Sequence, residues 1–331
     1  MNKKITFTFD YEPFLFKTGD IEKTLINPTT ELLEKLRSNG IEGTFFIDTF
    51  FLSRILEDLG PNSELWMKIS AQIFQIHNLG HEIGLHLHPH WIDAKFHNTE
   101  WDLSNVKKYR IHSLSKDEID NIIKKSIDII HNITRDKIWS EQISFRAGGW
   151  AIQPFSYLSD IFIKYNILID SSVSKGVSNS KKPFNYDFEK IQIQGAYKFL
   201  EDVTIKHKSG KFLEVPITSY SYTFIMKLIS RLDKYLRSEI YQTYGKGESV
   251  KSGEFRGNKV YKYFKTERMM LSIDRMKPTM FKKLLKSIDE SNIVIISHPK
   301  DYSQSSGICL DLVSKITYLK FVKLMDIDKF K

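Results

Sequence analysis

The chain has 331 residues, of which 41% are hydrophobic and 27% charged, and its net charge at neutral pH is +9. This balance is typical of a globular protein and excludes a disordered chain, and no apolar run approaches the roughly 20 residues that a transmembrane helix needs. The single cysteine, Cys309, excludes an intrachain disulfide and a thiolate metal cluster, so any metal must be bound by His, Asp or Glu.

The basic residues are scattered along the chain rather than gathered in one stripe, which indicates a solvated surface and argues against a nucleic-acid partner. The positive field can still favour an acidic saccharide, or a sugar linked to a nucleotide or a lipid. Near the N-terminus, Asp10 and Glu12 interrupt any apolar segment that could follow the first lysines. A signal peptide is therefore not expected, and the expected location is the cytoplasm.

Short β-type runs alternate with helical segments in the first half of the chain, which predicts an α/β fold. In the first strand, KITFTFD (4–10), alternation places Ile5, Phe7 and Phe9 on one face and Thr6, Thr8 and Asp10 on the other. A helix is predicted from Asn27 and Pro28 to Gly40, and the strand GTFFID (43–48) follows it. A second helix over about 63–79 leads into the strand EIGLHL (82–87).

The second half continues this alternation around one irregular region. A capping box of Ser115 and Glu118 predicts the start of a helix, which is followed by the strand QISFRA (142–147), another helix and the strand NILID (166–170). Residues 175–265 hold a strand in KFLEVPIT (211–218) and a basic helical stretch at about 223–245. We interpret them as an insertion into a single domain that spans residues 1–331. The last predicted helix starts near Pro278 and precedes the buried strand NIVIIS (292–297).

Four of the ten histidines lie within GHEIGLHLHPHW (80–91), a density that indicates a metal site. His86 and His90 have the H-x-x-x-H spacing that can bring two imidazoles together on one side of a turn, and they are the predicted ligands. His81 and His88 are interpreted as structural or supporting residues. The alternative for any one of these histidines is a hydrogen bond in a polar turn.

A carboxylate is the expected third ligand, because two His and one carboxylate leave positions open for water and substrate. Asp10 and Glu12 are two residues apart on an extended chain, so both side chains can lie on the same side of the sheet. One can bind the metal while the other acts as a base. The alternative for Glu12 is that it caps a turn with Pro13. Zinc suits these ligands, and cobalt, nickel, manganese and iron are alternatives.

Five motifs, taken together, resemble those of the polysaccharide deacetylase (NodB-like) family. TFDYE resembles the first motif and GLHLHPH the second, while SFRAGGW, IDSSV and ISHPKDY resemble the third, fourth and fifth. The forms D-x-E, F-R-A, D-S-S and H-P are most similar to the branch that includes O-antigen-associated deacetylase-like proteins of the WbmS type. The resemblance implies an irregular (β/α) barrel of the NodB or glycoside hydrolase/deacetylase type, with its pocket at the ends of the strands.

The resemblance also implies a role for each matching residue. Asp10 matches the catalytic base, and Arg146 matches the arginine that orients it. His298 matches the general acid, and Asp170 matches the aspartate that pairs with that histidine. The implied metal ligands are His86 and His90. Tyr11 occupies the place of the family's metal-binding aspartate, so Glu12 is the predicted substitute, and the roles of Asp10 and Glu12 are open to exchange.

The predicted function is the metal-dependent hydrolytic removal of an acetyl group from an N-acetylated sugar, during synthesis of a surface polysaccharide. An amide resists hydrolysis because its carbonyl is a poor electrophile and its amine a poor leaving group, so a Lewis acid, a base and an acid are all useful. Two alternatives stay open. One is amide hydrolysis of a small ring or ureide, as in allantoinase-like relatives, and the other is a noncatalytic carbohydrate-binding protein.

Overall fold

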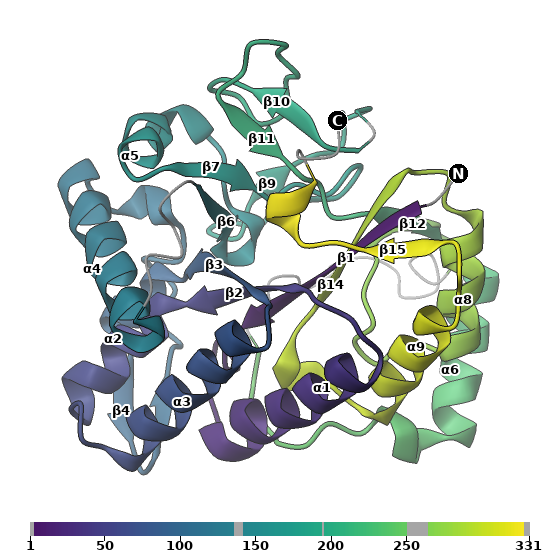
Figure 1. Ribbon diagram of the computed structural model, residues 1–331, viewed down its shortest axis with the longest axis horizontal. Coiled ribbons are helices and arrows are strands. Elements are labelled where there is room, and N and C mark those ends of the chain that lie inside the picture. The colour runs from purple at the N-terminus through teal and green to yellow at the C-terminus, as the bar shows by residue number, and fades with distance from the viewer. Residues whose placement is uncertain (1–2, 136–141, 194, 250–263, 328–331) are drawn as a thin grey trace.

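The structure is a computed structural model that describes residues 3–135, 142–193, 195–249 and 264–327 (Figure 1). Its centre is a curled sheet in the order β10-β11-β7-β6-β3-β2-β1-β14, and β15 pairs with the start of β1. All neighbours in this sheet run parallel except β10 and β11. The strands are β1 (Lys3–Tyr11), β2 (Thr44–Asp48), β3 (Glu82–Leu87), β6 (Ile143–Ala147), β7 (Ile167–Asp170), β10 (Tyr197–Phe199), β11 (Phe212–Glu214), β14 (Asn292–Ser297) and β15 (Leu319–Phe321).

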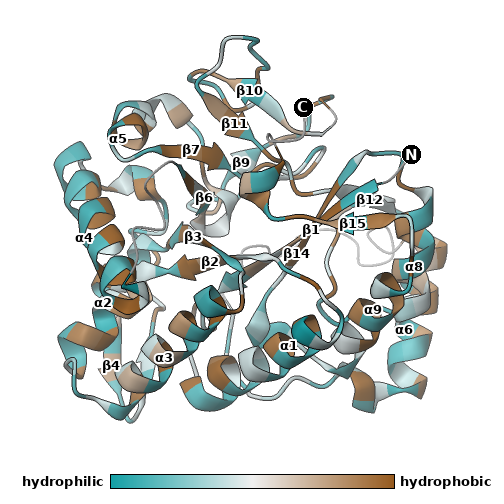
Figure 2. Cartoon of the chain, viewed as in Figure 1, coloured by the Kyte–Doolittle hydropathy of each residue, from teal (hydrophilic) through white to brown (hydrophobic). Residues whose placement is uncertain are grey.

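Helices cover the outer face of this sheet and turn their hydrophobic residues toward it (Figure 2). They are α1 (Asn27–Ser38), α2 (Thr49–Asp58), α3 (Glu64–Asn78), α4 (Lys116–Thr134), α5 (Ser159–Lys164), α8 (Pro278–Ser287) and α9 (Gln304–Ser314). A further helix, α6 (Phe224–Leu236), stands at the edge of the molecule, and most of its large hydrophobic side chains are exposed. The predicted capping box is confirmed, because the Ser115 hydroxyl accepts from the backbone N–H of Glu118 while the Glu118 carboxylate accepts from that of Ser115.

Three two-stranded antiparallel sheets lie outside the main sheet: β4 (Lys95–His97) with β5 (Glu100–Asp102), β8 (Ser178–Asn179) with β9 (Tyr186–Asp187), and β12 (Ser219–Tyr222) with β13 (Glu267–Met270). The region 175–265, interpreted from the sequence as an insertion, supplies the first two strands of the main sheet order, β10 and β11, as well as α6. This region therefore adds two strands to the main sheet as well as a peripheral helix.

The gap between β14 and the chain that follows β11 is closed by single backbone hydrogen bonds instead of a further strand. The N–H of Ile296 donates to Leu271 at 3.0 Å, and that of Leu271 donates to Thr218 at 2.7 Å. On the other side of the gap, Ile217 donates to Val173 at 2.8 Å. The fold is thus a curled, mostly parallel half-barrel whose closure is irregular, and the predicted α/β fold class is confirmed.

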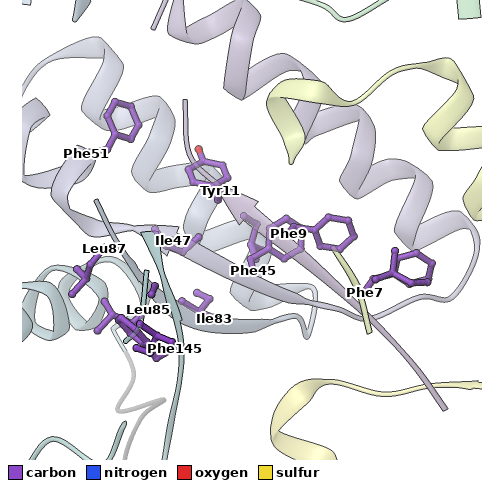
Figure 3. Close-up of a cluster of buried hydrophobic side chains, with 14 of the residues drawn as sticks. Phe7, Phe9, Tyr11, Phe45, Ile47, Phe51, Ile83, Leu85, Leu87 and Phe145 are labelled. Carbon is purple, nitrogen blue, oxygen red and sulfur yellow. The ribbon is translucent and has the colours of Figure 1, made fainter. Parts of the chain in front are cut away.

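The two faces of the sheet have different cores. Ile5, Phe7 and Phe9 belong to the large cluster between sheet and helices, of which Figure 3 shows a part. A smaller cluster that includes Phe46 and Val294 forms a second core. Thr8 and Asp10 point to the other face, where both contact the Arg146 guanidinium. The alternation predicted for the first strand is therefore confirmed.

The C-terminal segment crosses the end of the barrel at which the parallel strands begin. After β15, the N–H of Leu324 donates to the Thr44 hydroxyl at 3.1 Å, and the N–H of Met325 donates to the Glu82 carboxylate at 3.1 Å. Both acceptors lie at the first residue of a strand. Because the C-terminal segment packs against the amino ends of these strands, it does not cover their carboxyl ends, where a functional site can form. Every helix in the described part of the chain is too short or too polar to cross a membrane.

The structure contains two helices that the sequence patterns did not reveal. α2 starts directly after β2, where the Asp48 carboxylate caps the N–H groups of Phe50 and Phe51. Its residues continue the apolar run of the strand, so no turn signal separates the two elements. The second is α9. The helix that starts at Pro278 was predicted to be the last one, but it is α8, and α9 follows it.

Candidate active site

Polar side chains from three strand ends line one cavity of about 240 Å³. They are Asp10 and Glu12 from the end of β1, His86 and His88 from the end of β3, and His298 and Lys300 from the turn after β14. A larger cavity of about 910 Å³ lies beside the β8–β9 hairpin, but its lining contains none of the groups of three metal-ligating side chains found among the described residues. The chemistry is therefore argued for the smaller cavity.

Glu12, His86 and His88 direct three donor atoms at one point. His88 Nε2 lies 2.6 Å from Glu12 Oε2, His86 Nε2 lies 3.0 Å from the same oxygen, and the two nitrogens are 3.0 Å apart. Donor atoms around a tetrahedral zinc with bonds of about 2.1 Å are roughly 3.4 Å apart. The three buried side chains would therefore need to move only slightly apart to hold a divalent ion between them. Two imidazoles and a carboxylate are also a donor set that zinc accepts.

The orientation of His86 is set by the strand beside it. Its Nδ1 donates to the backbone carbonyl oxygen of Arg146 at 2.7 Å, which turns Nε2 toward the cavity. The glycine after Ala147 keeps the next imidazole close, because a Cβ on Gly148 would lie 2.4 Å from the Leu87 carbonyl oxygen and 2.8 Å from His88 Nδ1. The SFRAGGW motif thus supports the histidines of the GLHLHPH motif.

His90, predicted as a ligand, does not join this group; His88 takes its place. His88 has an extended backbone (φ −115°, ψ 89°) and continues the alternation of β3, so its ring follows that of His86. His90 lies in the 3₁₀ turn Pro89–Asp93, where its ring packs against Tyr109 with centroids 5.2 Å apart. Burial lowers the pKa of His90 to about 3, which keeps this imidazole neutral.

The predicted consequence concerns metal content. His88→Ala is expected to abolish stoichiometric zinc binding, because it removes one of the three converging donor atoms. His90→Ala is the matched control, since it removes an equally buried imidazole outside the group. Isothermal titration with zinc and elemental analysis of the purified variants measure the effect. Metal loss in the His90 variant with retention in the His88 variant would restore the H-x-x-x-H assignment.

Lys300 holds the second oxygen of Glu12. Its Nζ donates to Glu12 Oε1 at 2.6 Å and to the Pro13 carbonyl oxygen at 3.1 Å. Burial alone would raise the pKa of Glu12, but the charges of Lys300 and His88 and the hydrogen bonds of His86 and His88 hold it well below its ordinary value. Glu12 is therefore ionised. Lys300 binds its Oε1, and its Oε2 lies close to the Nε2 atoms of both imidazoles.

Asp10 is engaged by the buried guanidinium of Arg146. Arg146 Nη1 donates to Asp10 Oδ1 at 2.5 Å, while Nη2 donates to the Thr8 hydroxyl and Nε to the Ser171 carbonyl oxygen. The guanidinium also lies over the Phe46 ring, 4.3 Å from its centroid. With these donors satisfied, Arg146 fixes Asp10 so that its other oxygen, Oδ2, faces the cavity 3.6 Å from His298 Nε2.

His298 is oriented by Asp274, which the sequence interpretation did not single out. Asp274 Oδ2 accepts from His298 Nδ1 at 2.8 Å, and Asp274 Oδ1 accepts from the His298 backbone N–H at 3.1 Å. Burial lowers the pKa of His298, but the hydrogen bond and charge of Asp274 and the charge of Asp10 outweigh it and raise this pKa to about 9. The imidazolium therefore prevails at neutral pH, with Nε2 directed toward Asp10.

Asp170, predicted as the partner of His298, lies elsewhere. It ends β7, where its carboxylate accepts from the Ser172 hydroxyl at 2.8 Å, and it faces Glu214, its partner in the register of β7 and β11. Burial raises the pKa of both carboxyl groups, and the charge of Asp170 adds to the effect on Glu214, whose pKa lies well above its ordinary value. Asp170 thus belongs to a buried acid pair beside Arg146 and not to the histidine.

This acid pair predicts a pH-dependent stability. Because the pKa of Glu214 is raised in the folded state, folding binds a proton between the unfolded pKa of about 4.3 and the folded pKa, so the free energy of unfolding falls as pH rises through that window. Glu214→Gln removes the titrating group and is expected to unfold at higher urea concentration than wild type at pH 8. The exposed Glu34→Gln is the control. Equal midpoints at pH 5 and pH 8 in wild type would contradict the prediction.

Three residues of the site were not singled out from the sequence: His88 and Lys300, which line the cavity, and Asp274, which contacts His298 beside it. The period of two in strand β3 contained a signal for His88, because His86 and His88 are two apart. Lys300 follows His298 by two residues, but an isolated lysine gives no sign of burial. Asp274 lies 24 residues before its histidine in an irregular segment, so no local pattern pointed to it.

Comparisons with known proteins found similarity to solved structures only, at the level of the fold. No protein-family model matches the sequence, and no curated protein does. Among solved structures, a candidate polysaccharide deacetylase from Mycobacterium smegmatis aligns at 14% identity over 100% of this chain and 91% of that one, with a TM-score of 0.49. A family 4 carbohydrate esterase from Streptomyces lividans, in complex with acetate, aligns at 10% identity over 96% and 91%, with a TM-score of 0.42.

A carbohydrate esterase family 4 pseudoenzyme from Bacillus anthracis also aligns, at 11% identity over 98% of this chain and 65% of that one, with a TM-score of 0.42. An enzyme and a pseudoenzyme therefore match this chain about equally well. Identities and scores this low leave the activity to be argued from the residues of the cavity.

Proposed function

We propose that this protein is a metal-dependent hydrolase that removes the acetyl group from an N-acetylated sugar. The observation that carries the proposal is that one cavity combines a three-donor metal group, Glu12 with His86 and His88, with a carboxylate held by arginine and an imidazolium held by aspartate. Amide hydrolysis needs a Lewis acid, a base and an acid, and this cavity offers a candidate for each.

Glu12, His86 and His88 would hold the metal. When bound, a divalent ion supplies Lewis acidity toward the acetyl carbonyl and toward the attacking water. The chain's own contribution is to fix the His86 ring through the Arg146 carbonyl and to keep Glu12 ionised through Lys300. Zinc is the proposed ion, because two imidazoles and one carboxylate are a common donor set for catalytic zinc.

Asp10 is the proposed base. Its Oδ1 is held by Arg146, so Oδ2 is the free oxygen that can accept a proton from water in the cavity. Because Arg146 is fully buried and hydrogen-bonded on several sides, it holds the carboxylate in one orientation. The alternative role of Asp10 as a metal ligand has less support, since Glu12 and not Asp10 shares the point at which the imidazoles converge.

His298 is the proposed acid. As an imidazolium it donates a proton from Nε2 to the departing amine, and Asp274 holds its Nδ1–H throughout. After the reaction the amine carries the proton from His298 and the acetate carries the oxygen of the water, while Asp10 loses its proton to solvent and His298 regains one from solvent. The complete set of Asp10, Arg146 and His298 argues against the alternative of a noncatalytic binding protein.

The cavity restricts the substrate. Its volume of about 240 Å³ equals roughly eight waters at their share of liquid volume, which is room for an acetamido group and part of a sugar ring. The aromatic residues Tyr109 and Trp150 are part of its lining. We propose an acetylated sugar of a surface polysaccharide, such as an O-antigen precursor linked to a nucleotide or a lipid in the cytoplasm, as the physiological substrate.

The test is acetate release from a panel of N-acetylated sugars, free and nucleotide-linked, together with ring opening of small ureides such as allantoin. Activity on a sugar that is lost with a chelator and restored by zinc supports the proposal. Ring opening of the ureides without acetate release from any sugar would move the assignment to cyclic amide hydrolysis. Chelator-resistant activity would show that the group of Glu12, His86 and His88 is not the reaction centre.

A further inference from the structure

The helix α6 presents its apolar face to solvent. Its large exposed hydrophobic residues follow the helical spacing, so they form one stripe, and their exposed fractions range from 42% to 82%. They are Ile225, Leu228, Ile229, Leu232, Tyr235 and Leu236. A helix on the surface of a globular protein normally turns such a stripe toward the core. In α6 the arrangement is reversed, and α6 stands at the edge of the molecule (Figure 2).

The opposite face of α6 is attached to the protein mainly by polar groups. Asp233, which is buried, accepts hydrogen bonds from Arg237, Lys277 and Tyr241. Ser230, one turn earlier, is also buried and contacts the Met280 sulfur at 3.8 Å. The Asp233 cluster holds the orientation of α6, because rotating the helix would place a charged carboxylate and its partners in solvent and break these bonds. The outward stripe is therefore a stable feature of the fold.

Basic residues accompany this stripe. The segment 224–237 contains four basic residues and one acidic residue, and the acidic one is the buried Asp233. Arg231 and Lys234 are exposed on the helix, and the chain as a whole carries +9. An exposed apolar stripe with Lys and Arg beside it is the combination that binds helices in the plane of an anionic bilayer surface.

Charge also decides between a membrane and a second copy of this chain. In a twofold dimer built on α6 the same patch faces itself, so Arg231 and Lys234 of each copy would lie near their counterparts and repel one another. Anionic headgroups instead complement these side chains while the acyl region takes up the Leu and Ile residues. We propose that α6 docks the protein on an anionic membrane surface, with this stripe inserted between the lipids.

The position of α6 in the chain connects the docking surface to the cavity. After α6 the backbone passes through a 3₁₀ turn (Ser238–Tyr241) and reaches Ser249, which lines the cavity of Glu12 and His298. Along this path Thr243 bridges to Ser303, and Glu248 bridges to Lys17. A surface-bound α6 is thus joined by twelve ordered residues, 238–249, to the wall of the cavity.

Vesicle sedimentation tests the proposal without any activity assay. Wild-type protein should sediment with vesicles of equal parts phosphatidylglycerol and phosphatidylcholine, and should bind pure phosphatidylcholine much more weakly. Leu228→Glu combined with Leu232→Glu should lower the partition coefficient by about tenfold or more, because two inserted side chains become charged. Arg231→Glu combined with Lys234→Glu should weaken binding and reduce its salt dependence.

Matched controls come from the loop between β10 and β11. Ile205 is as exposed as the stripe residues, at 60%, and Lys206 beside it is exposed, so Ile205→Glu and Lys206→Glu should leave binding unchanged. Equal losses in these variants would overturn the proposal. So would a wild-type protein that ignores anionic vesicles, or a wild-type dimer in sedimentation velocity that the Leu228/Leu232 variant dissociates, which would assign the stripe to a second copy.

A reporter variant covers the case in which the double glutamate variant fails to fold. Tyr235 is 82% exposed, so Tyr235→Trp should fold normally. Its emission should shift to shorter wavelength with phosphatidylglycerol vesicles and be quenched by brominated acyl chains, relative to wild type with its five native tryptophans. No additional quenching in a vesicle-bound Tyr235→Trp variant would show that another surface binds the lipid and would refute the role of α6.

Discussion

Replacing Asp10 with asparagine is expected to lower kcat for deacetylation by about a thousandfold, within the range of 10² to 10⁴ that a positioned base contributes. Asparagine keeps the size of the side chain and can accept from Arg146 through its amide oxygen, so the local packing survives. It cannot take a proton from water. Zinc should stay bound, since Asp10 is not one of the three converging donors. Initial rates of acetate release and elemental analysis measure the two effects.

Glu12→Gln is the companion variant that separates the two carboxylates of DYE. It removes the anion at the point where His86 and His88 converge, so the metal should be lost together with turnover. If Asp10→Asn loses the metal and Glu12→Gln retains it, the assignments are exchanged. Thermal unfolding of both variants is the control, because the Asp10 variant leaves a buried Arg146 without its ion-pair partner, which destabilises the fold.

The part of this site that follows a strand could be predicted from the sequence. Asp10 and Glu12 are two apart at the end of β1, and the structure places both on the cavity, as alternation requires. Arg146 and His298 also end strands, β6 and β14, whose carboxyl ends open on the same face of the sheet. Parallel topology therefore brings together residues that lie up to 288 positions apart.

The structure departs from the predicted arrangement of the site where the chain leaves a strand. The H-x-x-x-H spacing favoured His90, but Pro89 begins a 3₁₀ turn that carries His90 away, whereas His88 keeps the extended backbone and the strand period. The D-S-S motif suggested Asp170 as the partner of His298. The register instead pairs Asp170 with Glu214, and Asp274 reaches His298 from an irregular segment whose path depends on tertiary packing.

Helix α6 illustrates another limit of sequence patterns. The sequence predicted a basic helical stretch at about 223–245, and the structure contains α6 followed by a 3₁₀ turn in that range. Periodicity gives the position of an apolar stripe on a helix, but not what the stripe faces. The orientation is set by Asp233, whose partners Lys277 and Tyr241 come from other elements, so only the folded chain reveals that the stripe is exposed.

Replacing His298 with alanine is expected to lower kcat by about 10² to 10⁴, with little change in KM and none in zinc content. Protonation of the amine matters chiefly in the transition state, so its loss reduces turnover more than ground-state binding. His298 is not one of the converging donors, and its Nε2 lies 3.9 Å from Glu12 Oε1. Steady-state kinetics with metal-replete protein measures the effect, and a variant that deacetylates at the wild-type rate would exclude His298 as the acid.

Asp274→Asn tests whether this histidine acts as an imidazolium. In wild type the kcat profile should be level below the pKa of His298, about 9, and should fall above it, because the deprotonated ring cannot donate to the amine. Asp274 provides the largest contribution that raises this pKa against the effect of burial, so its loss should move the alkaline limb to lower pH. At pH 6 the variant should recover part of the turnover that it lacks at pH 8, a response that His298→Ala cannot show. An alkaline limb at the same pH in wild type and Asp274→Asn would mean that another group limits the rate and that the contact between Asp274 and His298 serves only the fold.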